Sequence, residues 1–427
     1  MIIMNKFLLL TLIVLFISFP GCNKQVSDPS PIPTQDKTYS QATTEPQIPE
    51  KTEVPQTKYF VGDEEKKLAN SNTEFGLKLF NKINKEDFGK NICISPLSLS
   101  IALDMTYNGS DKSTREAMTK VLELTGMKSD EINIASSNLI NFLKSSKDDL
   151  KLTIANSIWY REDLQFSPEF ENICKNYYFS EVRKGITIND VNSWCKDNTG
   201  GKIEKFLNEL PSNLAVLLVN AVYFKGTWAY KFDREKTTEE YFTLLNKSKK
   251  KVPMMRQHNE FYYYRGDKFQ AVSLPYRDGK ISMYIFLPDS DSSLEAFQKN
   301  LDMKNWKKWM DGFHPKEGDI CLPGFKIEYG TKKLNDPLIS LGMEVAFKPT
   351  ANFSKMCLNK DNLYISQVLH KTFIEVNEEG TEAAAATAVL MADSVSLTFS
   401  MVCNRPFFFV IRDNETGTIL FMGSMVE

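Results

Sequence analysis

Histidine is scarce in this chain of 427 residues, and the short motifs that accompany many catalytic sites are missing. The three histidines lie far apart, at His258, His314 and His370, and the first two stand in polar stretches where we expect exposed side chains. No Gly-x-Ser-x-Gly, His-Glu-x-x-His or Walker-type glycine-rich loop occurs. The fragment Gly200-Gly201-Lys202 lacks the remaining residues of a phosphate loop, and we predict that it caps the C-terminus of a helix. We therefore predict that the chain is not an enzyme.

A strong charge of one sign is also missing. The chain has 52 basic and 54 acidic residues, and its formal net charge is -2. Such a balance does not favour binding to nucleic acid or to an anionic membrane surface, so we expect neither partner. One basic cluster occurs, and we predict that it is a solvated turn between two strands; it consists of Lys247, Lys249, Lys250 and Lys251.

Long hydrophobic runs are confined to the N-terminus. The run from Phe7 to Phe19 follows Lys6 and is too short to span a bilayer as a stable helix, which is typical of a secretory signal. It ends in Phe19-Pro20-Gly21-Cys22, which resembles the lipobox of bacterial lipoproteins, where the cysteine is lipidated. Two outcomes stay open, a cell-surface lipoprotein anchored at Cys22 and a secreted protein released by ordinary cleavage. Both predict an extracellular location, with membrane contact only through an N-terminal lipid.

Residues 23–60 have the composition of a linker. This stretch is rich in Pro, Thr, Gln and Ser and shows no apolar periodicity, so it cannot bury a core. We predict a disordered spacer that holds a folded domain away from a surface. The predicted organisation is thus a signal peptide over residues 1–22, a linker over 23–60 and one folded domain over 61–427.

Cysteines at metal-site spacing are absent from the folded part. Its six cysteines are isolated from one another, at Cys93, Cys174, Cys195, Cys321, Cys357 and Cys403. An even number in an exported chain permits disulfides. Several of them stand in apolar, strand-like surroundings, however, and we predict buried free thiols. We expect neither a metal nor a cofactor.

Apolar periodicity predicts helices early in the domain and strands late. Helical patterns cover residues 64–84, a stretch that begins at Ser95-Pro96, and residues 114–150. Strand-like runs follow, at residues 152–160, 215–224, 261–264, 271–274, 281–287, 320–327, 371–376, 407–411 and 419–422. Because helices and strands do not alternate, the order predicts an α+β domain with large mixed or antiparallel sheets.

The segment from Gly380 to Ala388 contains almost only small side chains. Four consecutive alanines favour a helix, but about ten residues do not hold a helix in water without packing partners. With a period of two, Thr381, Ala383, Ala385 and Thr387 share one face of a strand. Small residues on that face allow the segment to slide between two existing strands, and Gly380 allows the chain to turn over. The composition therefore suits an exposed loop that can become a central strand.

Here the chain resembles the serpin family. Glu378-Glu379-Gly380-Thr381-Glu382 with the following alanines is similar to the serpin hinge, and residues 402–409 are similar to the family signature. Four further stretches carry the resemblance, at residues 91–98, 192–203, 218–228 and 368–371. The resemblance covers nearly the whole domain and implies a serpin fold of three sheets with eight or nine helices and an exposed reactive-centre loop.

The resemblance also implies roles for individual residues. Glu378, Gly380, Thr381, Ala383, Ala385 and Thr387 would form the hinge. Ser95, Ser98, Asn220 and His370 would form a polar shutter under the main sheet, and Trp228 would pack at the breach where insertion starts. For the four shutter residues and for Trp228 the alternative interpretation is an ordinary core residue with its hydrogen bonds satisfied. A buried hydrogen-bond network is compatible with both interpretations.

The implied activity is inhibition of a protease, and the expected partner is a serine protease held in a covalent 1:1 complex by a monomer. The usual family count from Gly380 predicts cleavage between Ser394 and Val395; a loop one residue shorter would place it between Asp393 and Ser394, and Met391 is a third candidate. Three other functions stay open. They are a non-inhibitory serpin that is cleaved as a plain substrate, an inhibitor of a cysteine protease cut after Asp393, and a surface lipoprotein that merely binds a partner.

Overall fold

The structure, a computed structural model, describes residues 61–145, 150–211, 214–359, 362–381 and 398–427. The predicted signal peptide with Cys22 and the predicted linker lie outside these residues. Most of the predicted reactive loop lies outside them too, including Ala383, Ala385, Thr387, Asp393, Ser394 and Val395.

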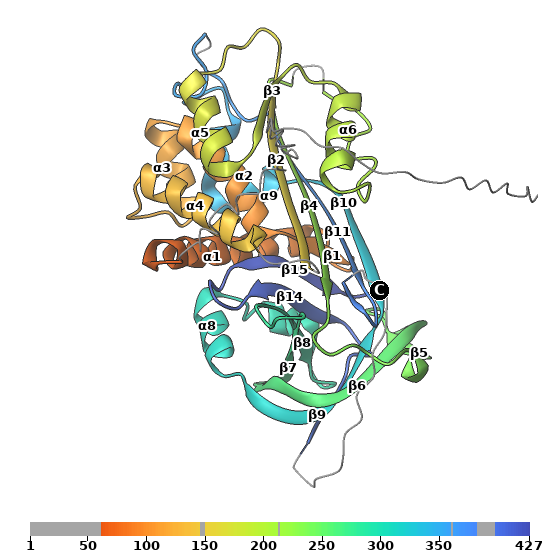
Figure 1. Ribbon diagram of the computed structural model, residues 1–427. Helices are drawn as coiled ribbons and strands as arrows, with labels where there is room; N and C mark the ends of the chain where they lie inside the picture. The colour runs from red at the N-terminus through yellow and green to blue at the C-terminus, as the bar shows by residue number, and fades with distance from the viewer. Residues whose placement is uncertain (1–60, 146–149, 212–213, 360–361, 382–397) are drawn as a thin grey trace, which may run out of the picture. The chain divides into compact units, whose positions relative to one another are not determined.

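Nine α-helices occur in the part of the chain that the structure describes (Figure 1). They are α1 (Asp63–Glu86), α2 (Pro96–Gly109), α3 (Lys112–Val121), α4 (Ser129–Lys144), α5 (Pro168–Tyr178), α6 (Ile188–Asn198), α7 (Leu294–Gln298), α8 (Met303–Asp311) and α9 (Asn335–Leu338). The helical stretch predicted over residues 114–150 is divided in two, because Glu123 and Gly126 adopt positive φ angles between α3 and α4. The last residue of that stretch already begins a strand.

The helix termini follow from local chemistry. Ser95 caps α2 by accepting a hydrogen bond from the Ser98 N–H at 3.4 Å, as the Ser-Pro start signal predicted. After α6, Gly200 and Gly201 adopt positive φ angles and the Gly201 N–H bonds the Lys196 carbonyl at 2.8 Å. The predicted helix cap at these glycines is therefore confirmed.

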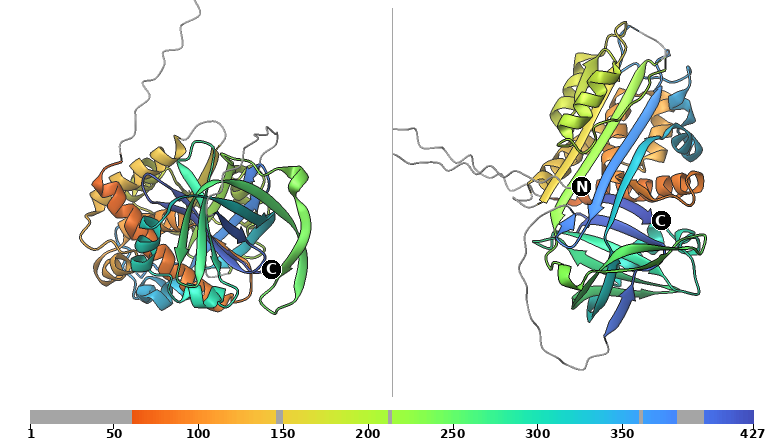
Figure 2. Two further views of the ribbon diagram at one scale, coloured as in Figure 1. Left: turned by 90° about the horizontal axis from the view of Figure 1, so that it is seen from below. Right: turned by 90° about the vertical axis from the view of Figure 1, so that its right-hand side faces the viewer.

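The strands pair into two sheets within the described residues. The six-stranded main sheet has the order β10-β11-β4-β2-β3, with β12 paired to β4. Its strands are β2 (Leu150–Tyr160), β3 (Glu181–Lys184), β4 (Val216–Thr227), β10 (Phe325–Lys333), β11 (Gln367–Val376) and β12 (Gly380–Thr381). Figure 2 shows its long strands side by side in the right-hand view.

The nine-stranded second sheet has the order β1-β15-β14-β8-β7-β6-β9-β13, with β5 paired to β6. Its strands are β1 (Ile92–Ile94), β5 (Thr238–Thr243), β6 (Lys249–Gly266), β7 (Phe269–Pro275), β8 (Ile281–Pro288), β9 (His314–Pro323), β13 (Phe399–Val402), β14 (Phe407–Asp413) and β15 (Ile419–Met425). The long strand β6 belongs to both halves of this sheet, so a division at β6 yields the three sheets that were predicted. The predicted strand over residues 320–327 is in fact two strands, since the chain passes from one sheet to the other at Gly324.

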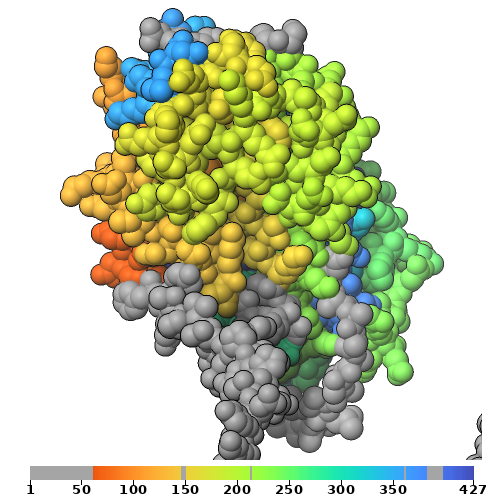
Figure 3. Space-filling model, turned by 45° about the horizontal axis from the view of Figure 1, so that its top comes forward, coloured from red at the N-terminus to blue at the C-terminus, as the bar shows by residue number. Residues whose placement is uncertain are grey.

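The two faces of the main sheet are covered differently. One face packs on the large core below α1 to α5, and the other lies under α6 (Figure 1). Trp194 and Cys195 of α6 pack with Leu217, Val219 and Ala221 of β4. Figure 3, in which the top of the view in Figure 1 comes forward, shows the segments around α5 and α6 in yellow to yellow-green as one continuous surface.

The six cysteines of the described residues are free and buried, as predicted. The basic cluster lies where β5 turns into β6, with Lys247 in the turn and Lys249, Lys250 and Lys251 at the start of the strand. No helix among the described residues is long and apolar enough to cross a membrane.

Candidate functional site

The centre of the main sheet contains a row of polar side chains. The parallel strands β4 and β11 pair from Gln367↔Leu217 to Phe373↔Tyr223, and we call this boundary the seam. Across it His370 stands opposite Asn220, and Asn220 stands opposite Asn156 on β2. All three side chains are buried. Three neighbouring strands thus present one polar row to the core.

Hydrogen bonds connect this row to α2. The Nε2 of His370 accepts from the Ser95 N–H at 3.1 Å, so the ring proton lies on Nδ1, which bonds the Asn220 Oδ1. The Asn220 Nδ2 donates to the Ser98 Oγ and to the Asn156 Oδ1. Burial lowers the pKa of His370 to about 3, so the imidazole is neutral at physiological pH. The structure therefore brings Ser95, Ser98, Asn220 and His370 into one network.

Asn156 is a member of this network that was not predicted. Its signal was present, because it is an amide within the otherwise apolar strand pattern of residues 152–160. Only the register of β2 against β4 places it beside Asn220. A new strand between β4 and β11 would have to break the bond between His370 and Asn220. The network is therefore placed where it can resist separation of the seam.

At one end the seam is open. Pairing of β4 with β11 stops at Tyr223, although β4 continues to Thr227 and β11 to Val376. In this region Gly380 pairs with Thr227 and Thr381 with Gly226, in antiparallel register. The first two residues of the predicted inserting segment thus already form a strand on β4.

Gly380 is required at this turn by both conformation and space. Its φ angle is 147°, and a Cβ atom there would lie 2.1 Å from the Gly226 carbonyl oxygen. Backbone hydrogen bonds between Asn377 and Gly380, at 2.9 and 3.2 Å, close the turn. The adjacent Thr381 is fully buried, and its hydroxyl is 2.7 Å from the Tyr276 Oη. Thr381 therefore faces the core, the side predicted for Ala383, Ala385 and Thr387.

Trp228 binds the turn by two hydrogen bonds. Its indole stacks on Tyr276 with ring centroids 4.5 Å apart, and its Nε1 donates to the Asn377 carbonyl at 2.9 Å. The Trp228 N–H donates to the Glu379 carbonyl, also at 2.9 Å. Two carbonyl groups of the turn are thus bound to one residue. Tyr276 was not predicted, and nothing in its local sequence distinguishes it from a core residue.

The two hinge glutamates have separate partners. Glu378 accepts a 2.8 Å hydrogen bond from the Thr237 hydroxyl. Glu379 is 3% exposed and is paired with Lys231 at 2.7 Å and with Arg234 at 3.4 Å. Because a buried carboxylate requires a cation, these pairs hold the segment before Gly380 against the loop that follows β4.

Among the described residues, no group of three or more His, Cys, Asp and Glu side chains is arranged to hold a metal ion. His258 and His314 are exposed, as predicted, and His370 belongs to the buried network.

Comparison with known proteins identifies the architecture. The family model described as serpin (serine protease inhibitor) matches residues 70–427. A leukocyte elastase inhibitor of Xenopus laevis is 35% identical and covers 83% of this chain and 98% of its own length. Serpin-Z7 of Hordeum vulgare is 34% identical, with 83% and 95% covered.

Solved structures agree with this assignment. The native state of the thermophilic serpin tengpin has a TM-score of 0.80 and 34% identity, covering 86% of this chain and 95% of that one. Human thyroxine-binding globulin complexed with its hormone has a TM-score of 0.79 and 28% identity, covering 85% and 99%. With the family model matched over most of the domain and the fold reproduced in solved relatives, this chain belongs to the serpin family.

Proposed function

We propose that the protein inhibits a serine protease as a suicide substrate and holds it in a covalent 1:1 complex. The observation that carries the proposal is the pairing of Gly380 and Thr381 with the open end of β4. An inserting segment needs a starting point inside the sheet, and these two residues supply it. In this role the chain is an inhibitor and not an enzyme.

Cleavage would start the reaction. The protease nucleophile attacks the carbonyl carbon of Ser394, and the amine of Val395 leaves as a new N-terminus. The ester that forms joins the protease to the free end of the loop. If the pairing of β12 continues, each later residue lies one position further back along β4, which brings Thr387 opposite Asn220. Insertion carries the protease along and distorts its active site before water can hydrolyse the ester.

New backbone hydrogen bonds supply the driving force. About twelve inserted residues, at roughly 0.5–1.5 kcal/mol net for each bond, correspond to about 6–18 kcal/mol. The core-facing positions remain compatible with insertion because Thr381, Ala383, Ala385 and Thr387 are small. A large or charged side chain at one of these positions would remove much of that gain.

Target specificity depends on which bond is cut. Ser394 before the scissile bond suits proteases with small pockets, Asp393 suits aspartate-directed proteases, and Met391 suits chymotrypsin-like ones. We favour Ser394. We also propose that the protein acts as a monomer outside a bacterial cell, held by a lipid at Cys22 or released after cleavage of the signal peptide, with residues 23–60 as the spacer.

The test is incubation with a panel of proteases, followed by denaturing gels and mass spectrometry of the small C-terminal fragment. We expect a gel-stable complex and a fragment that begins at Val395. A fragment that begins at Ser394 would move the cut to Asp393. Cleavage without any complex would identify a non-inhibitory serpin, and a chain that binds a partner without being cleaved would be a binding protein.

A further inference from the structure

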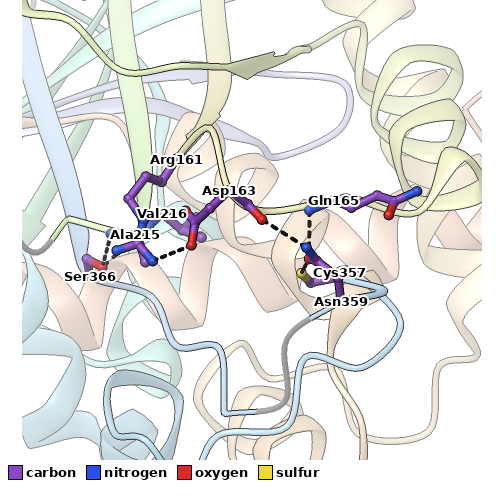
Figure 4. A network of polar contacts seen from close by, with 8 residues as sticks. All are labelled: Arg161, Asp163, Gln165, Ala215, Val216, Cys357, Asn359 and Ser366. Atoms are coloured by element: carbon purple, nitrogen blue, oxygen red, sulfur yellow. Dashed lines mark hydrogen bonds and ion pairs between the residues drawn. The ribbon is translucent and has the colours of Figure 1, made fainter.

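The end of the seam opposite the hinge is closed by a serine side chain (Figure 4). The Oγ of Ser366 accepts hydrogen bonds from the N–H groups of Ala215 at 3.0 Å and Val216 at 3.4 Å. The Ser366 N–H donates to the Val216 carbonyl at 3.1 Å. Ser366 directly precedes β11, and Val216 is the first residue of β4. We call these three hydrogen bonds the Ser366 clasp.

The clasp is fixed from both sides. On the β2 side, the Arg161 N–H donates to the Ala215 carbonyl at 3.0 Å, and the Arg161 guanidinium forms a bidentate pair with Asp163 at 2.5 and 2.8 Å (Figure 4). On the β11 side, the Asn335 Nδ2 donates to the Ser366 carbonyl at 2.9 Å. The Asn335 Oδ1 accepts from the Val368 N–H at 3.1 Å. These bonds hold the starts of β4 and β11 in place.

The register of β12 indicates which inserted residue would reach the clasp. Thr381 pairs with Gly226, and the same antiparallel register would bring Met391 opposite Val216. These two positions on β4 are about ten residues apart, which corresponds to about 34 Å of strand. Insertion would meet the polar row at Asn220 on the way and the clasp at its end. The clasp is thus the last contact across the seam that a complete insertion has to break.

The clasp stabilises the protein before loop insertion and not after it. Before insertion, the N–H groups of Ala215 and Val216 are satisfied by the Ser366 hydroxyl. After insertion, a neighbouring strand would supply carbonyl acceptors along this edge of β4, and the hydroxyl would no longer be needed there. We propose that Ser366 is a positioning residue that opposes the final stage of loop insertion and so keeps the uncleaved protein in its active form. This inference rests on the inhibitory mechanism proposed above.

The test compares intact and loop-cleaved protein for Ser366→Ala, Ser366→Thr and a control, Ser340→Ala. Ser340 is exposed and its hydroxyl bonds only the nearby Pro337 carbonyl among the described residues. For Ser366→Ala we expect a lower melting temperature of the intact form and an unchanged melting temperature of the cleaved form. Inhibitory activity should be lost on storage about 30-fold faster, as expected for two lost hydrogen bonds. Ser366→Thr retains the hydroxyl and should restore wild-type behaviour, and Ser340→Ala should resemble wild type in each measurement.

The outcomes separate this inference from the proposed function. If cleavage raises the melting temperature of the wild type, but Ser366→Ala lowers both forms equally, Ser366 is merely a structural residue and the inference is wrong. A storage half-life of Ser366→Ala equal to that of wild type also overturns it. If cleavage leaves the wild-type melting temperature unchanged, loop insertion does not occur, and the inhibitory mechanism and this inference are both refuted.

Discussion

Gly380→Ala tests the starting point of insertion. The added methyl group would meet the Gly226 carbonyl oxygen at 2.1 Å and the Thr227 Cα at 2.7 Å, which are backbone atoms that cannot move aside. The φ angle of 147° is in addition strongly unfavourable for alanine. The same register is needed in the inserted form, because the pair of Gly380 with Thr227 is its first pair. The substitution therefore opposes insertion as well as the contacts of the intact hinge.

The free-energy penalty of Gly380→Ala can be estimated from the backbone strain and the overpacking. Backbone strain contributes about 1–3 kcal/mol, and overpacking contributes about 1–3 kcal/mol. Detachment of the hinge strand would relieve both but would lose its two pairs and the hydrogen bond of Thr381 with Tyr276, at about 1 kcal/mol each. The strand takes whichever of the two states costs less, so the penalty is about 2–3 kcal/mol. After cleavage, insertion competes with hydrolysis of the acyl-enzyme, and a penalty of about 2 kcal/mol changes that ratio about 30-fold.

The assay is the number of inhibitor molecules consumed for each protease molecule inactivated. We expect Gly380→Ala to be cleaved at the wild-type rate, with most of it released as cleaved product. Gly126→Ala is the matched control, since Gly126 also has a positive φ angle, of 80°, but no atom lies within 4 Å of an added Cβ. That variant should lose about 1 kcal/mol of stability and retain full inhibition.

A Gly380→Ala protein that forms the complex with wild-type yield would refute the reasoning. It would mean that the turn at Asn377 to Gly380 can move without consequence for insertion. Loss of inhibition in Gly126→Ala as well would attribute the effect to general destabilisation.

Thr381→Arg should convert the inhibitor into a substrate that is still cleaved in its loop, because the buried position against Tyr276 cannot accept a guanidinium. A full yield of covalent complex would contradict this prediction. Asn156→Ala removes the acceptor of the Asn220 amide and should destabilise the intact protein by about 1–3 kcal/mol, measured as a lower melting temperature. Burial raises the pKa of Asp104 to about 8, whereas an aspartate in the unfolded chain ionises near 4. The free energy of unfolding should therefore fall as the pH rises from about 4 to 8, by about 5 kcal/mol in total. Unfolding measured over that range should lose this slope in Asp104→Leu and retain it in Asp311→Asn, a substitution of an exposed aspartate.

The sequence alone determined the class of fold and the segment that inserts. Periodicity located α1, the start of α2 and most strands, since amphipathic patterns and caps are local properties. The small residues after Gly380 and their alternation with period two predicted which face turns to the core, and Thr381 has that orientation in the structure. The motif resemblance indicated the family, and the comparisons confirm it.

Only the tertiary structure decided how distant residues meet. Asn156, Asn220 and His370 form a row because three strands from separate parts of the chain pair in a particular register, and no local pattern encodes that register. Tyr276 reaches Thr381, and Ser366 reaches Ala215, across more than a hundred residues of sequence. These contacts depend on long-range strand pairing, and for that reason they could not be read from the residues on either side of them.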